Sequence, residues 1–83
     1  MFPKIGDIYT HYKNPDKHYE IVCVGKFKET KEDMIAYRAL YPVVDLGEEF
    51  SKDPVFFRTL ADFMAVLPDG KSRFKKVEIE DRR

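Results

Sequence analysis

Three residues near the start of the 83-residue chain have the types and spacing of a ligand-binding row. Tyr9, His11 and Lys13 are two residues apart, so in an extended strand their side chains would share one side. An aromatic ring, a titratable imidazole and a cation in one row could stack on a ring and hold an anion. The alternative is that they only cover the surface of an edge strand.

Two arginines in the middle of the chain have a similarly ambiguous setting. Arg38 and Arg58 each stand between apolar or aromatic neighbours. A guanidinium in such a place either holds a planar anion through two hydrogen bonds or pairs with an internal carboxylate such as Glu29 or Asp62. The sequence leaves both roles open for each arginine.

From these side chains we predict a shallow polar and aromatic pocket on one face of the fold, built from Tyr9, His11, Tyr37 and Arg58. Arg58 would hold an anionic or carbonyl group of the ligand, and His11 would donate or accept a hydrogen bond depending on pH. The tyrosines would stack on a ring of the ligand. The second histidine, His18, lies beside charged residues and is expected to be a solvated surface ring.

No other pattern in the chain is typical of catalysis, of a cofactor or of a metal site. A nucleophile next to a base, two facing carboxylates and a glycine-rich phosphate loop are all missing from the sequence. The single Cys23 has no partner for a disulfide, and with His11 and His18 it does not have the spacing of a zinc site. We therefore expect no enzyme activity, no cofactor and no metal. Between Val22 and Val24, Cys23 is predicted to be buried and unreactive.

Charge and composition narrow the classes of partner. Fifteen basic and fifteen acidic side chains cancel, so we expect no general binding to duplex DNA and none to a membrane surface. No apolar run resembles a signal peptide or a membrane span, and the expected location is cytoplasmic. Hydrophobic residues make up 43% of the chain, which favours a single compact domain over residues 1–83 with its core in about residues 6–79.

The elements that would position these side chains are mostly strands. Alternation of apolar and polar residues predicts five of them, at residues 7–12, 18–27, 34–41, 55–59 and 74–79. A turn is expected at 14–16, where Asn-Pro-Asp stands. Thr59 has the character of a helix N-cap, with Asp62 three residues later, so one short helical turn should precede the last strand. This order is that of a small SH3-like five-stranded barrel in which the last strand pairs with the first.

Several blocks of residues together match a known family pattern: Gly6 to Lys13, Tyr19 to Val22, Glu29-Thr30, Tyr37 to Tyr41, Arg58 to Leu60, Phe63 and Arg73-Phe74, which span most of residues 6–77. Through these residues the chain resembles the small bacterial domain-of-unknown-function family numbered 1653. Three positions depart from the family pattern: Phe27 replaces His, Phe56 replaces Trp and Thr59 replaces Pro. The resemblance supports the fold and implies no activity.

Together these features predict a small binding or adaptor module that grips a small anionic or aromatic ligand, a peptide or a single-stranded nucleic acid through its Tyr, His and Arg face. The alternative is a structural or regulatory interaction subunit without a small-molecule site. Such a subunit would instead expose a flat apolar patch, for which residues 55–57 are the candidates.

Overall fold

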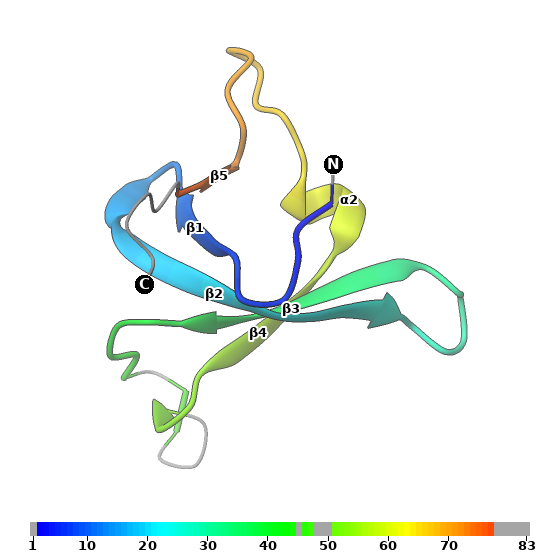
Figure 1. Ribbon diagram of the computed structural model, residues 1–83, viewed down its shortest axis with the longest axis horizontal. Helices are drawn as coiled ribbons and strands as arrows, with labels where there is room; N and C mark the ends of the chain where they lie inside the picture. The colour runs from blue at the N-terminus through cyan, green and yellow to red at the C-terminus, as the bar shows by residue number, and fades with distance from the viewer. Residues whose placement is uncertain (1, 45, 48–50, 78–83) are drawn as a thin grey trace.

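A computed structural model of the protein describes residues 2–44, 46–47 and 51–77. These residues form one antiparallel sheet and one short helix (Figure 1). The elements are β1 (Ile8–His11), β2 (Asn14–Lys26), β3 (Asp33–Ala39), β4 (Val55–Thr59), α2 (Leu60–Phe63) and β5 (Phe74–Lys76). The mainly β class, the five strands and the short helical turn before the last strand are thus confirmed. Residues 78–79 of the predicted last strand lie outside the described residues.

The sheet is open, and the predicted barrel is not confirmed. Its strand order is β4-β3-β2-β1-β5, so the last strand does pair with the first, as expected. Among the described residues no strand pairing joins β4 to β5. The chain between these two strands holds α2 and a loop closed by the isolated Val66–Ser72 bridge, and the three residues of β5 are all paired with β1.

The second strand begins earlier than the sequence indicated. The predicted turn at 14–16 is wrong: the chain reverses at residues 12–13, and β2 already starts at Asn14. Its pairing with β1 shifts between Thr10 and His11, so that His11 faces Asn14 while Thr10 faces His18. An irregular register tolerates Pro15, which has no N–H to donate to a partner strand.

One face of the sheet carries the core. Figure 1 shows β2, β3 and β4 nearly edge-on, with β1, β5 and α2 on the same side. We call this side of the sheet its concave face. The buried cluster on it consists of Ile21, Ile35, Tyr37, Leu60, Phe63 and Phe74. Phe63 of α2 stacks on Phe74 of β5, with ring centroids 4.2 Å apart and planes 9° apart. This stack fixes the helix against the last strand.

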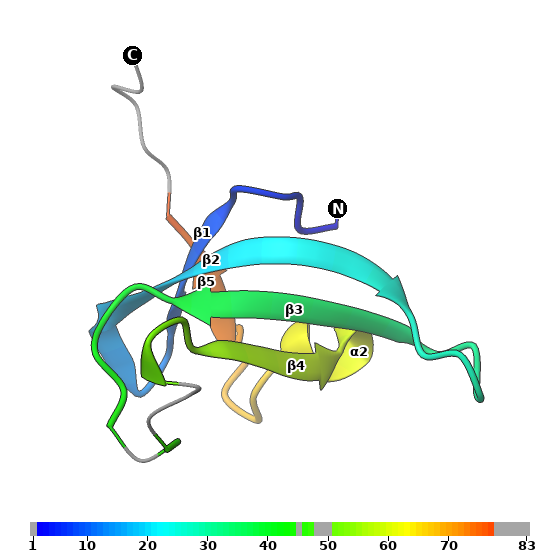
Figure 2. The same ribbon diagram turned by 90° about the horizontal axis from the view of Figure 1, so that it is seen from below.

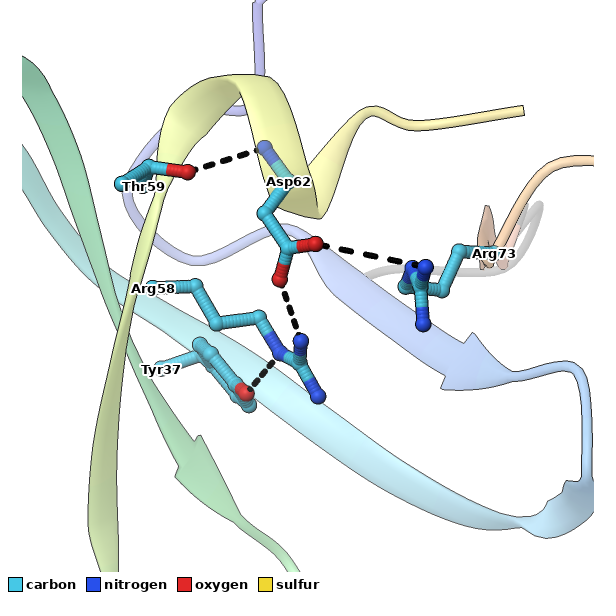
Figure 3. A network of polar contacts seen from close by, with 5 residues as sticks. All are labelled: Tyr37, Arg58, Thr59, Asp62 and Arg73. Atoms are coloured by element: carbon cyan, nitrogen blue, oxygen red, sulfur yellow. Dashed lines mark hydrogen bonds and ion pairs between the residues drawn. The ribbon is translucent and has the colours of Figure 1, made fainter. Parts of the chain in front are cut away.

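The junction between β4 and α2 follows the sequence prediction. Thr59 ends β4 and caps the helix, its hydroxyl accepting a hydrogen bond from the Asp62 backbone N–H at 3.0 Å. Because the helix begins directly after the strand, Asp62 lies close to Arg58 on the concave side (Figure 3). The cap therefore also positions a charged pair.

The opposite, outer face has an apolar area that no described residue covers. Figure 2 shows the strands from a second direction, with α2 behind β4. Cys23, Ala36 and Phe57 are neighbours across three strands, and they help line a groove of about 410 Å³. Phe57 is 69% exposed. Of residues 55–57, which the sequence singled out for an apolar patch, Phe57 lines this groove, whereas Phe56 packs against the core.

The prediction that Cys23 is buried is wrong, because the thiol is exposed on this outer face. The register of β2 against β3 shifts between Ile21 and Cys23: Ile21 faces Tyr37, whereas Cys23 faces Ala36. The extra residue reverses the alternation of side chains along β2. Ile21 therefore points into the core, and Cys23 does not.

We expect Phe63→Ala to lower the free energy of unfolding by about 3–5 kcal/mol, because it empties the centre of the aromatic core. The same deletion at Phe57, on the exposed face, should change it by less than about 1 kcal/mol. Urea denaturation of both variants measures the difference. Equal losses would show that the core does not lie on the α2 side of the sheet.

Candidate ligand-binding site

A pocket of about 240 Å³ opens on the concave face beside the core. It brings together three of the four predicted site residues, His11 from β1, Tyr37 from β3 and Arg58 from β4. Its complete lining is His11, Asn14, Tyr19, Tyr37, Tyr41, Phe56, Arg58 and Phe74. The pocket thus combines aromatic walls with a few polar groups, which is the usual make-up of a small-ligand site.

Tyr9, the fourth predicted residue, does not line this pocket. Its ring packs edge-on against Phe63 at 5.1 Å and borders a separate depression near Lys75 and Lys76. Burial, and then the charge of Asp7, raises the pKa of Tyr9. Alternation along β1 places Tyr9 and His11 on one side, but Phe63 and Phe74 occupy the space between the two depressions.

Arg58 lines the pocket and belongs to the network of polar contacts drawn in Figure 3. Its Nε donates a hydrogen bond to the Tyr37 hydroxyl at 2.7 Å, and its Nη1 forms an ion pair with Asp62. The guanidinium carbon lies 5.3 Å from the centre of the Phe74 ring. Burial alone would lower the pKa of Arg58, but the bonds to Asp62 and Tyr37 outweigh it and raise that pKa. The arginine is therefore a fixed cation.

A second arginine approaches the same carboxylate from the other side. Arg73 Nη2 is 4.0 Å from Asp62 Oδ1, and Figure 3 shows both guanidinium groups directed at Asp62. The Arg73 Nε is buried and has no hydrogen-bond partner among the described residues. Two partly buried guanidinium groups thus share one carboxylate. The three side chains together leave a net positive charge beside the pocket.

The positive charge of the two arginines acts on the His11 imidazole. Its ring packs edge-on against Phe74 at 5.0 Å. Burial, followed by the positive charges of Arg58, Arg73 and Lys13, lowers the pKa of His11 from 6.5. The imidazole is accordingly neutral at pH 7. Its Nδ1 accepts a hydrogen bond from the Lys13 backbone N–H at 3.2 Å, so Nε2 carries the proton and can donate it to a ligand.

The far wall of the pocket is a pair of tyrosines. The Tyr19 and Tyr41 hydroxyls are hydrogen-bonded to each other, and the Lys17 ammonium lies 4.8 Å from the centre of the Tyr41 ring. Burial and the hydrogen bond with Tyr41 raise the pKa of Tyr19. Burial also raises the pKa of Tyr37, against the opposing effect of Arg58. These phenols therefore act as neutral rings and hydrogen-bonding groups.

The remaining candidates lie elsewhere. Arg38 contributes to the outer side of the sheet, where its Nε donates to Asp53 at 2.7 Å and its Nη1 is 3.5 Å from Glu20. His18 makes a local contact with the backbone carbonyl of Asp16 at 3.1 Å. Arg38 and Arg58 thus both have carboxylate partners, and Arg58 in addition lines the pocket on the concave face.

The predicted site lacked five residues that line the pocket, Asn14, Tyr19, Tyr41, Phe56 and Phe74, and it lacked the neighbouring Arg73. Asp62, which the sequence offered as a carboxylate partner, does pair with Arg58. The alternation of β4 could have identified Phe56, because it puts Phe56 and Arg58 on one face. Arg73 could not be found in this way, since it precedes β5 outside any strand. Only the fold of the 64–73 loop brings it to Asp62.

The effect of Arg58 on His11 can be measured directly. Arg58→Gln removes a nearby positive charge, so the pKa of His11 should rise toward its usual value of about 6.5. Arg58→Lys keeps the charge and should leave the pKa low. An NMR titration of the imidazole protons gives both values, with His18 in the same spectra as a reference. A midpoint unchanged by Arg58→Gln would contradict the described electrostatics.

The described residues contain no group of three or more His, Cys, Asp or Glu that could hold a metal ion. Nor does the described part of the chain include a helix long and apolar enough to cross a membrane.

Comparisons with known proteins identify the family and nothing more specific. No curated protein and no solved structure matches the chain significantly. A family model described as "Protein of unknown function (DUF1653)" matches residues 7–76, nearly the whole chain, and the protein therefore belongs to that family.

Proposed function

We propose that this protein is a small, non-enzymatic binding module that takes one planar ring of a small ligand into the concave pocket. The observation that carries the proposal is the position of Arg58 in a depression walled by aromatic rings. Rings there provide stacking and edge contacts, while Arg58, His11 and Asn14 provide hydrogen bonds that orient the ligand.

The size of the pocket favours a small ligand over a polymer. A volume of about 240 Å³ is below the usual 300–1,000 Å³ of sites for drug-sized molecules, so the pocket suits a single ring with its substituent. A single-stranded nucleic acid would need several stacking rings along a basic groove. The balanced charge of the chain argues in addition against general binding to duplex DNA or to an anionic membrane.

The second candidate function, an interaction subunit, is favoured by the outer face. Phe57 is 69% exposed there and Phe27 is 48% exposed, beside the groove that Cys23 and Ala36 help to line. An apolar patch of this kind commonly marks a protein contact. In this case the partner would bind to the face opposite the pocket, and Phe57 would contribute more to binding than Phe56.

Two adjacent phenylalanines of β4 provide a matched test, because Phe56 lines the pocket and Phe57 lies on the other face. The probes are benzamide and benzoate, two planar rings that differ in charge. We expect at least one of them to shift NMR signals of residues around the pocket. Phe56→Ala should weaken that binding at least about threefold, since it removes one aromatic wall. Phe57→Ala should leave it unchanged.

Two outcomes contradict the proposed function. The first is that neither probe shifts any signal near the pocket at millimolar concentration. The second is that Phe57→Ala weakens binding as much as Phe56→Ala does, which would place the contact on the outer face. Unchanged near-ultraviolet circular dichroism shows that each variant is folded.

A further inference from the structure

The hydrogen bonds of Arg58 leave one edge of its guanidinium for a ligand. Nε donates to Tyr37, and Nη1 donates to Asp62. No hydrogen bond from Nη2 to a described residue exists, and Figure 3 shows this nitrogen directed away from Asp62. A guanidinium has five N–H groups, so Nη2 and the second hydrogen of Nη1 remain. Together they form the two-pronged edge that fits both oxygens of a carboxylate.

The charges around this edge add up to a single positive charge. Arg58 and Arg73 contribute two, Asp62 removes one, and His11 is neutral at pH 7. The side chains of both arginines are about 30% exposed, so water screens them less than a surface charge. Lys13 and Lys17 are exposed and lie against the rings of Tyr12 and Tyr41, where solvent weakens their effect.

The ion pair between Asp62 and Arg58 also limits what can bind next to it. Any anion bound to the Nη1 and Nη2 edge of Arg58 lies close to the Asp62 carboxylate, because both bind the same guanidinium group. A monoanion is matched by the excess positive charge of the arginine pair. A dianion such as a phosphate monoester would be left with one unbalanced negative charge facing Asp62, and like charges brought together in a partly buried site are costly.

We propose that Asp62, shared by Arg58 and Arg73, makes the pocket selective for a planar ring that carries a carboxylate, against the neutral amide and against the phosphate ester. The carboxylate lies on the Nη1 and Nη2 edge of Arg58, and the ring lies among the aromatic walls. Asp62 is then a specificity-determining residue that does not itself contact the ligand's ring. This inference rests on the proposed function of the same pocket.

The test compares benzamide, benzoate and phenyl phosphate, which share a ring and carry no charge, one and two negative charges at pH 8. For the wild-type protein we expect benzoate to bind at least about fivefold more tightly than either of the others, measured by NMR titration. Arg73→Gln should reduce benzoate binding to the level of benzamide, because it removes the excess charge.

Asp62→Asn should reverse the preference between the two anions. The amide keeps the size of the side chain and, through its backbone N–H, the bond to Thr59, while the pocket gains one positive charge. Phenyl phosphate should then bind more tightly than benzoate. The control is Asp69→Asn, which removes a negative charge from an exposed turn that does not border the pocket. It should leave the wild-type order unchanged.

The outcomes separate this inference from the proposed function. Equal binding of benzamide and benzoate overturns the carboxylate preference and leaves the binding module intact. Tightest binding of phenyl phosphate to the wild-type protein also overturns it, as does an unchanged order in Asp62→Asn. Absence of binding by all three probes overturns both. If a variant fails to fold, the order in which the wild-type protein binds the three probes still tests the carboxylate preference.

Discussion

The fold has to accommodate a positive charge on the core face of its sheet. Arg58 occupies the side of β4 that also carries Phe56, and its guanidinium lies over the Phe74 ring. A charge in such surroundings must be compensated within hydrogen-bond reach. Tyr37 and Asp62 provide that compensation from β3 and α2. The arginine therefore connects the sheet, the helix and the aromatic core.

Most of the residues that compensate the charge of Arg58 lie close to it in the sequence. Thr59 ends β4 and at the same time caps α2, so the helix starts without a linker and carries Asp62 to the position four residues after Arg58. The aromatic stack of Phe63 on Phe74 then holds the helix against β5. Arg73, the residue before Phe74, consequently reaches Asp62 as well. One helical turn thus determines both the core and the charge of the pocket.

Much of this arrangement could be predicted from residue patterns. The bounds of β4, the cap at Thr59 and the return of the last strand to the first all follow from alternation and local propensity, and each is confirmed. Two errors arose from register. A shift after Ile21 turns Cys23 outward, and a shift after Thr10 moves the start of β2 to Asn14. Such shifts depend on the partner strand, and the strand's own sequence does not encode them clearly.

The candidate site was only partly predictable for a related reason. His11, Tyr37 and Arg58 share a face by strand alternation and do meet, whereas Tyr9 is separated from them by the rings of Phe63 and Phe74. The closure of the barrel is likewise not confirmed among the described residues, because element order does not state whether the end strands pair. Both depend on how the helix and the 64–73 loop fill the space between β4 and β5.

We propose that Arg58 serves the fold and the ligand at the same time, through different edges of one guanidinium. A crystal structure of the protein with benzoate would show this directly. We expect the carboxylate on Nη1 and Nη2 of Arg58, the ring in the pocket against Phe56, and the bonds of Arg58 to Tyr37 and Asp62 retained. A carboxylate that displaces Asp62 from Arg58, or a benzoate bound outside this pocket, would contradict it.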